Sequence, residues 1–234
     1  MDQHSIFTIG FDADDTLWHC ENHFAQAQAK FAAVLEPYSH GHVPLNLLYE
    51  TETRNMRLYG YGVKGFMLSM IETAVEITEG RIGGADIKRI IELGKAILDQ
   101  KLEMLPGARD VLEALAPRRL LLVTKGDLLD QEGKIARSGL AELFAGIEIV
   151  SEKDASAYRR LLDRHAIAPT QFIMVGNSLR SDIAPVLELG GRGIHVPYAV
   201  TPRHEQLEAP PPGVVTAGSI ADIPDLVRAF EVAA

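Results

Sequence analysis

Short apolar runs of strand length alternate with helical patterns along the chain, and this alternation limits the folds available to it. The runs at 119–124 (RLLLVT) and 172–175 (FIMV) are almost continuously apolar, which is typical of parallel strands covered on both faces. The chain has 234 residues and can therefore bury a large core. We predict an α/β fold, a Rossmann-like parallel sheet with helices on both faces. The predicted strands are 6–11, 119–124, 147–150, 172–175, 193–196 and 214–216.

The stretch between the first and second predicted strands has no clear strand pattern. Its apolar residues recur every three or four positions, as they do in helices that bury one face. Proline- and glycine-rich breaks at 37–44, 59–62 and 79–84 divide the stretch, because these residues interrupt helices. We interpret residues 19–103 as an inserted all-helical domain of four helices. Residues 1–18 and 104–234 would then form the α/β core domain.

The overall composition excludes several classes of partner and site. A net charge of −9 argues against binding to nucleic acid or to an anionic membrane, because both select basic surfaces. Cys20 is the only cysteine, so the chain can form no internal disulfide and no cysteine cluster for zinc. We find neither a signal-like N-terminus nor an apolar run of the ~18 residues that a membrane span needs. We therefore expect a cytoplasmic protein, a monomer or homodimer, that acts on a small molecule.

Three aspartates, Asp12, Asp14 and Asp15, follow the first predicted strand directly. Carboxylates held this close repel one another unless a cation lies among them. In an open parallel sheet, the carboxyl ends of the strands converge where the strand order reverses, so polar residues at other strand ends should join them. Carboxylates, a hydroxyl and an ammonium group are what a magnesium-assisted attack on phosphate needs. The other candidates at strand ends are Thr16, Thr124, Lys125, Lys153, Asn177, Ser178 and Asp182.

These residues resemble the four motifs of the haloacid dehalogenase-like hydrolases. The run DADDT at 12–16 resembles the first motif, DxDxT, and GNSLRSD at 176–182 resembles the fourth. Thr124 and Lys153 resemble the second and third motifs. The resemblance covers nearly the whole chain, because the helical insert is similar to the cap of many members. It implies a magnesium-dependent phosphomonoester hydrolase of the helical-cap type, which forms an aspartyl-phosphate on a small phosphorylated metabolite.

The resemblance also implies a role for each motif residue. Asp12 is the nucleophile that attacks phosphorus, which replaces one difficult displacement by two easier ones. Asp14 protonates the departing alkoxide and later takes a proton from water. Thr124 and Lys153 hydrogen-bond to the oxygens of the transferring phosphoryl group and neutralise their charge. Lys125 is a further candidate for substrate binding.

Magnesium prefers oxygen ligands, and the chain offers a suitable set. We expect the Asp12 carboxylate, the Asp14 backbone carbonyl and Asp182 to bind Mg²⁺. Asn177 stands where the family commonly has aspartate, and its amide oxygen can coordinate the metal or orient a water. Asp15 stands where many relatives have glycine, and we interpret it as a cap for the following turn.

Several alternatives remain open at this stage. A 2-haloacid dehalogenase of the same family also uses an aspartate nucleophile, but such enzymes lack an acid at the position of Asp14. A phosphomutase or phosphotransferase uses the same residues and differs in the group that accepts the phosphoryl. A non-catalytic, receiver-like phosphoprotein also gathers aspartates, threonine and lysine around magnesium. Within the helical insert, which should act as a lid, Tyr61 or Lys64 could reach a substrate.

Overall fold

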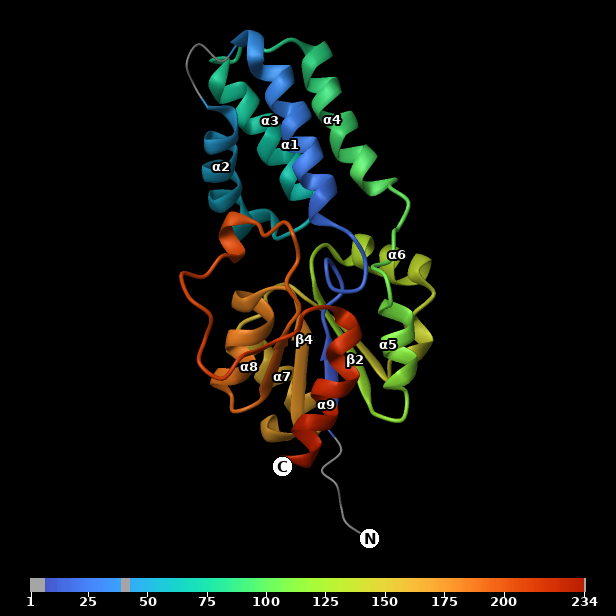
Figure 1. Cartoon of the computed structure of the whole chain (residues 1–234). Helices are drawn as coiled ribbons and strands as arrows, with labels where there is room; N and C mark the ends of the chain where they lie inside the picture. Colours follow the sequence, from blue (N-terminus) through green and yellow to red (C-terminus); the bar gives the residue numbers. More distant parts are fainter. Residues whose placement is uncertain (1–6, 39–42, 234) are drawn as a thin grey trace. The chain divides into compact units, whose positions relative to one another are not determined.

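The α/β fold predicted from the sequence is confirmed. The computed structural model describes residues 7–38 and 43–233 (Figure 1). All the neighbouring strands pair in parallel, and their order in the six-stranded sheet is β3-β2-β1-β4-β5-β6. Each predicted strand is found within two residues of its expected bounds, although Ile6 lies outside the described residues. The strands are β1 (Thr8–Phe11), β2 (Leu120–Lys125), β3 (Gly146–Val150), β4 (Phe172–Gly176), β5 (Arg192–His195) and β6 (Val215–Thr216).

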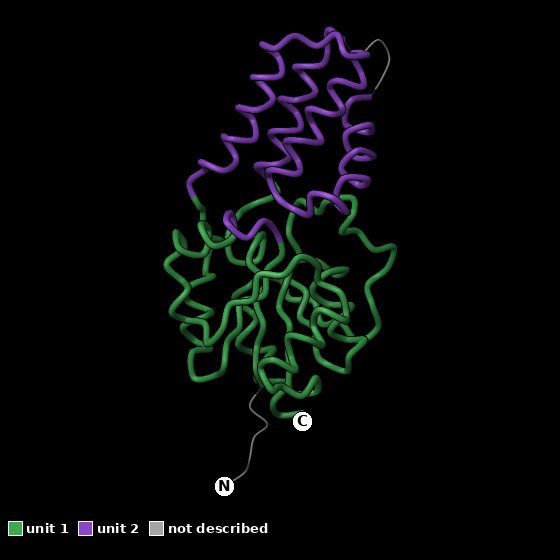
Figure 2. The backbone as a smooth tube through the Cα atoms, turned by 180° about the vertical axis from the view of Figure 1, so that it is seen from behind, with its two compact units in different colours: residues 1–21, 102–125, 131–234 green, residues 22–101, 126–130 purple. Residues whose placement is uncertain are grey.

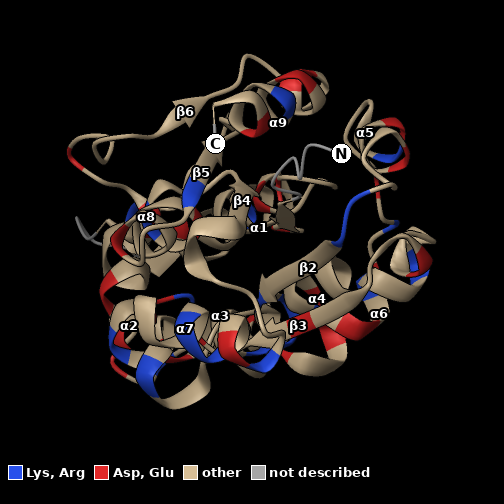
Figure 3. Ribbon diagram, turned by 90° about the horizontal axis from the view of Figure 1, so that it is seen from below, with Lys and Arg blue, Asp and Glu red and all other residues tan. Residues whose placement is uncertain are grey.

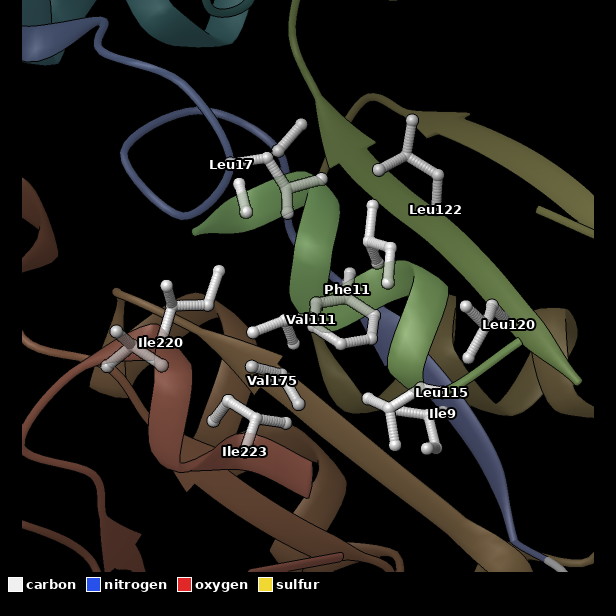
Figure 4. Close-up of a cluster of buried hydrophobic side chains, with 14 of the residues drawn as sticks. Ile9, Phe11, Leu17, Val111, Leu115, Leu120, Leu122, Val175, Ile220 and Ile223 are labelled. Carbon is white, nitrogen blue, oxygen red and sulfur yellow. The ribbon is translucent and has the colours of Figure 1, made fainter. Parts of the chain in front are cut away.

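Helices cover both faces of the sheet, and the sequence of each central strand supplies both contact surfaces. Because side chains alternate along a strand, Leu120 and Leu122 point to one face and Leu121 and Val123 to the other. The first face packs against α5 (Ala108–Ala114), α6 (Leu128–Ser138) and α9 (Ile223–Val232), as Figure 4 shows in part. The second packs against α7 (Ala155–Arg164) and α8 (Ala184–Glu188). Burial on both faces explains why these runs are apolar at almost every position.

The described residues form two compact units (Figure 2). Unit 1 holds the sheet and consists of the residues up to Glu21, Leu102–Lys125, and the chain from Gln131 onward. Unit 2 consists of Asn22–Lys101 and Gly126–Asp130. The expected division into a core domain and an inserted domain of residues 19–103 stays a prediction. Within residues 7–38 and 43–233, no helix combines the length and apolar character that a membrane span requires.

The expected helices of the insert are present in unit 2. They are separated at the predicted proline and glycine positions, since α2 begins at Pro44 and ends before Gly60, whose φ is 70°. Phe31, Phe66 and Met70 are among the side chains that form an apolar core of their own inside this unit. The helices are α1 (Glu21–Leu35), α2 (Pro44–Tyr59), α3 (Val63–Ile77) and α4 (Gly84–Leu98).

Glu52, on α2, makes the stability of unit 2 depend on pH. Burial raises the pKa of Glu52 from 4.5 to about 7, so the folded state binds this proton more tightly than the unfolded state does. The free energy of unfolding should therefore fall as the pH rises from about 4.5 through about 7. We expect Glu52→Gln to be more stable than wild type at pH 8, by up to about 3 kcal/mol, and equally stable at pH 4.

Urea unfolding of both proteins across this pH range measures the effect. Glu50→Gln is the matched control, because Glu50 lies on the same helix and is exposed. If the stability difference between wild type and Glu52→Gln is the same at every pH, the prediction is wrong.

Candidate functional site

The candidate site lies in unit 1, at the carboxyl ends of four neighbouring strands. Asp12 follows β1, Thr124 lies near the end of β2, and Lys153 lies in the loop between β3 and α7. Asn177 follows β4, and Asp182 lies on η4 (Leu179–Ile183), a single π-helical turn. The strand order proceeds from β1 through β2 on one side and through β4 on the other, so these ends meet where the order reverses. The sheet topology thus brings together residues up to 170 positions apart.

Lys153 joins two of the predicted carboxylates. Its Nζ donates hydrogen bonds to Asp12 Oδ1 at 2.5 Å and to Asp182 Oδ1 at 2.7 Å, and all three side chains are buried. Burial raises the pKa of Asp12 to about 7 even though Lys153 acts to lower it. Burial also opposes the charge on Lys153, but the two carboxylates raise its pKa well above the ordinary value. Lys153 is therefore charged and balances one of the two carboxylate charges beside it.

The second carboxylate oxygen of Asp12, Oδ2, faces residues of the first and fourth motifs. Thr16 Oγ1 donates to Asp12 Oδ2 at 2.9 Å. The amide nitrogen of Asn177 can donate to the same oxygen and to the Asp14 backbone carbonyl, each at 3.2 Å. Asp12 Oδ2, the Asp14 carbonyl and the Asn177 side chain therefore converge on one point.

This convergence fits the requirements of Mg²⁺. If the Asn177 amide places its oxygen at this position, that oxygen lies 3.2 Å from both Asp12 Oδ2 and the Asp14 carbonyl oxygen, close to the ~3 Å between neighbouring ligands of an octahedral magnesium ion. Among the described residues, no group of three His, Cys, Asp or Glu side chains could hold a metal ion, so carbonyl and amide oxygens have to complete the set.

Asp182, the other metal ligand that we predicted, is held differently from Asp12. Its Oδ1 accepts the bond from Lys153, and its Oδ2 accepts a bond from the backbone N–H of Ser178 at 2.9 Å. A Cβ at Gly176 would overlap this carboxylate, so the glycine of GNSLRSD leaves room for it. Asp182 thus orients Lys153 and the loop after β4, and its role as a metal ligand stays a prediction.

Asp14 is held by residues that the sequence did not lead us to consider. Lys134 Nζ donates to both carboxylate oxygens at 2.8 and 2.7 Å, and Trp18 Nε1 donates to Oδ1 at 2.6 Å. Gln131 Nε2 donates to Asp14 Oδ2 at 3.1 Å and to Thr124 Oγ1 at 2.5 Å. Burial alone would raise the pKa of Asp14, but Lys134 and the other donors lower it below its ordinary value. Asp14 is therefore mostly ionised at neutral pH, the state in which it can accept a proton, and only its minor protonated form can donate one.

Lys125 is paired within the protein. Its Nζ donates to Glu205 Oε1 at 2.5 Å and to Ser181 Oγ at 2.9 Å. Glu205 Oε2 also accepts bonds from the hydroxyls of Ser178 and Ser181. Burial would raise the pKa of Glu205, but the Lys125 charge and these hydrogen bonds lower it to about 2. The ion pair compensates the charge of Lys125, and a contact between Lys125 and substrate stays a prediction.

Two other expectations concern residues around the motifs. Asp15 has a φ of 63° and accepts hydrogen bonds from the backbone N–H groups of Cys20, at 2.8 Å, and Glu21. It thus caps the start of α1, and its left-handed conformation explains why glycine suits this position. In unit 2, Lys64 Nζ donates to both carboxylate oxygens of Asp127, at 2.9 and 3.0 Å. A substrate contact by Tyr61 or Lys64 stays a prediction.

Comparisons with known proteins establish the family of this chain. The family model described as haloacid dehalogenase-like hydrolase matches residues 6–190. The chain is 43% identical to a haloacid dehalogenase-like family hydrolase from Xanthomonas campestris, with a TM-score of 0.88 over 100% of this chain and 95% of that one. A search among curated proteins gave no significant match.

More distant structures share the fold. A predicted phosphoglycolate phosphatase from Haemophilus somnus has 17% identity and a TM-score of 0.62, and covers 96% of this chain and 99% of its own. The L-2-haloacid dehalogenase from Xanthobacter autotrophicus, with chloropropionic acid covalently bound, has 16% identity and a TM-score of 0.60, and covers 95% of this chain and 98% of its own. The family match and the Xanthomonas relative identify this chain as a hydrolase of the haloacid dehalogenase-like family.

Proposed function

We propose that this hydrolase is a magnesium-dependent phosphomonoesterase that acts on a small phosphorylated metabolite through an aspartyl-phosphate at Asp12. The observation that carries the proposal is the carboxylate of Asp14, two residues after the nucleophile and fixed by four hydrogen bonds. An alkoxide leaving group needs a proton, whereas a halide leaves as a stable anion. An acid-base residue at this position therefore favours phosphate esters over carbon–halogen bonds.

The reaction proceeds in two displacements. In the first, a carboxylate oxygen of Asp12 bonds to phosphorus, the bond from phosphorus to the ester oxygen breaks, and Asp14 in its protonated form gives that oxygen its proton. In the second, water attacks the same phosphorus while Asp14 takes a proton from the water. The bond from phosphorus to Asp12 then breaks, which releases phosphate and restores both aspartates. Thr124 and Lys153 stabilise the charge on the phosphoryl oxygens in both displacements.

The oxygen set around Asp12 supports the use of magnesium. Asp12 Oδ2, the Asp14 carbonyl and the Asn177 amide oxygen are hard ligands of the kind that Mg²⁺ selects. When bound, the metal supplies positive charge to the phosphoryl group and to the nucleophile. The aspartate that the family commonly has at position 177 is thus replaced by a neutral oxygen donor. In this proposal unit 2 is the cap that excludes water during the reaction.

A dehalogenase remains the second candidate, since one of the distant structures is an L-2-haloacid dehalogenase. The two functions make opposite predictions about the metal. We expect phosphate release from at least one of a panel of sugar phosphates, nucleoside monophosphates and phosphorylated small acids. The release should require Mg²⁺ and fall by about 100-fold or more in EDTA, because the metal stabilises charge in the transition state.

The same enzyme is incubated with 2-chloropropionate, and halide release is measured with and without EDTA. Halide release that is insensitive to EDTA, together with no phosphate release from the panel, would replace the phosphatase by the dehalogenase. Phosphate transfer to an added sugar or alcohol, in place of transfer to water, would identify a phosphotransferase.

A further inference from the structure

We propose that Gln131 and Lys134, one turn apart on α6, are positioning residues that hold Asp14 ready to accept the proton of the attacking water and connect it to Thr124. This inference rests on the proposed function and assigns two residues to it that none of the four motifs contains. The two residues are three positions apart on a helix, so their side chains lie on the same face. That face is turned toward the ends of β1 and β2.

Lys134 restricts the Asp14 carboxylate more than a single hydrogen bond would. Its Nζ contacts both oxygens, at 2.8 and 2.7 Å, and its side chain is only 12% exposed. Trp18, four positions after Asp14, donates a hydrogen bond from Nε1 to Asp14 Oδ1. The carboxylate is therefore fixed between α6 and the residues that follow β1. A base fixed in this way loses little freedom when it takes a proton from water.

Gln131 connects this base to the phosphoryl-binding residue. Its side chain is buried, and Nε2 carries two protons for three acceptors within reach: Thr124 Oγ1 at 2.5 Å, Asp14 Oδ2 at 3.1 Å and the Lys125 carbonyl at 3.2 Å. An amide nitrogen can only donate, so the Thr124 hydroxyl oxygen accepts this bond, and its own proton is left to donate. The acceptor expected for that proton is a phosphoryl oxygen. Gln131 thus sets the direction of the Thr124 hydroxyl and its distance from Asp14.

The other charged residues of α6 do not share this environment. Figure 3 shows that the helix carries both acidic and basic residues, and Glu132 and Arg137 are exposed. Lys134 is the basic residue of α6 that is directed to a carboxylate of the first motif. Arg137, one turn later on the same helix, is therefore a matched control for the removal of a positive charge.

The test is stopped-flow hydrolysis of para-nitrophenyl phosphate in Mg²⁺. Nitrophenolate leaves without a proton, so the first displacement does not depend on Asp14, while the second still does. We expect Lys134→Met to release about one nitrophenolate per enzyme in a burst at nearly the wild-type rate, and then to turn over about tenfold or more slowly than wild type. Gln131→Met should slow the burst itself, because the Thr124 hydroxyl loses its orientation.

Three further variants complete the experiment. Lys134→Arg should recover much of the steady-state rate, since it restores a cation to Asp14. Lys134→Met in an Asp14→Asn background should cause no additional slowing, because the two residues act together. Arg137→Met should behave as wild type in both phases.

Each other outcome has a definite meaning. If Lys134→Met lowers the burst amplitude and the steady-state rate in the same proportion, fewer molecules are folded, Lys134 is merely structural, and the inference is wrong while the phosphatase stands. Additive losses with Asp14→Asn would overturn it as well. If wild type releases no nitrophenolate and no phosphate from any ester, the proposed function is wrong, and the inference is rejected with it.

Discussion

Asp12→Asn is expected to abolish phosphate release while the protein stays folded. The neutral amide cannot attack phosphorus, so we expect kcat to fall by about 10³-fold or more, as for the loss of other covalent nucleophiles. The stability should respond in the opposite way. Burial raises the pKa of Asp12 to about 7, which shows that its charge is unfavourable in the folded state. The amide keeps an oxygen to accept the bond from Lys153 and brings no buried charge. The metal-free variant should therefore be as stable as wild type or more stable.

Steady-state phosphate release and urea unfolding in EDTA measure the two effects on the same preparations. Asp110→Asn is the matched control, because Asp110 is an exposed aspartate on α5. A rate within tenfold of wild type would exclude Asp12 as the nucleophile. If Asp12→Asn is inactive because it is unfolded, the prediction is wrong. The geometry predicts a variant that is inactive and still folded.

Lys153→Met is expected to be the most destabilising change in the site. The ammonium lies between two buried carboxylates, at 2.5 and 2.7 Å, and its side chain is only 2% exposed. Its removal leaves Asp12 and Asp182 close together without that charge, and the loss of one partner from a buried ion pair costs about 3–5 kcal/mol. We expect a loss of this size in the free energy of unfolding in EDTA. Mg²⁺ should restore part of it, because the metal supplies positive charge beside Asp12.

A second variant separates charge from packing. In Lys153→Met with Asp182→Asn, one of the two unpaired carboxylates is neutral, so this double variant should be more stable than Lys153→Met alone. Urea unfolding of Lys153→Met and of the double variant, each in EDTA and in Mg²⁺, gives the four free energies of unfolding to compare. If Asp182→Asn adds to the loss instead, repulsion between the two carboxylates is not its cause, and the electrostatic explanation is wrong.

Local patterns were sufficient to predict the sheet and the helices of unit 2. Runs such as 119–124 and 172–175 are apolar on both faces because helices cover both, and this condition is visible in the sequence without any tertiary information. The proline and glycine breaks around Pro44 and Gly60 likewise act within one turn of the chain. The motif residues were found because each lies at or shortly after the carboxyl end of a strand.

The residues that hold the motifs in place could not be predicted in this way. Glu205 pairs with Lys125 from 80 positions away and lies on η5 (Arg203–Glu205), a 3-10 helix too short to leave a pattern in the sequence. Gln131 and Lys134 have the spacing of any helix face, and their partners become apparent only when α6 is placed beside the ends of β1 and β2. Lys125 is an example: its charge is compensated by Glu205, which lies outside any motif, and its contact with substrate stays a prediction.

The C-terminal segment completes the sheet, so a truncated protein that keeps every motif would still lose part of the fold. The family match ends at residue 190, and a fragment cut there would keep Asp12, Thr124, Lys153 and Asp182. It would lack β5, β6 and α9, so β4 would become an open edge strand with unpaired backbone groups. It would also lack Glu205 and Arg192, whose guanidinium lies 4.7 Å from the Phe7 ring and 4.9 Å from that of Phe230. Such a fragment would contain every motif residue and still be prone to aggregate through its sheet edge.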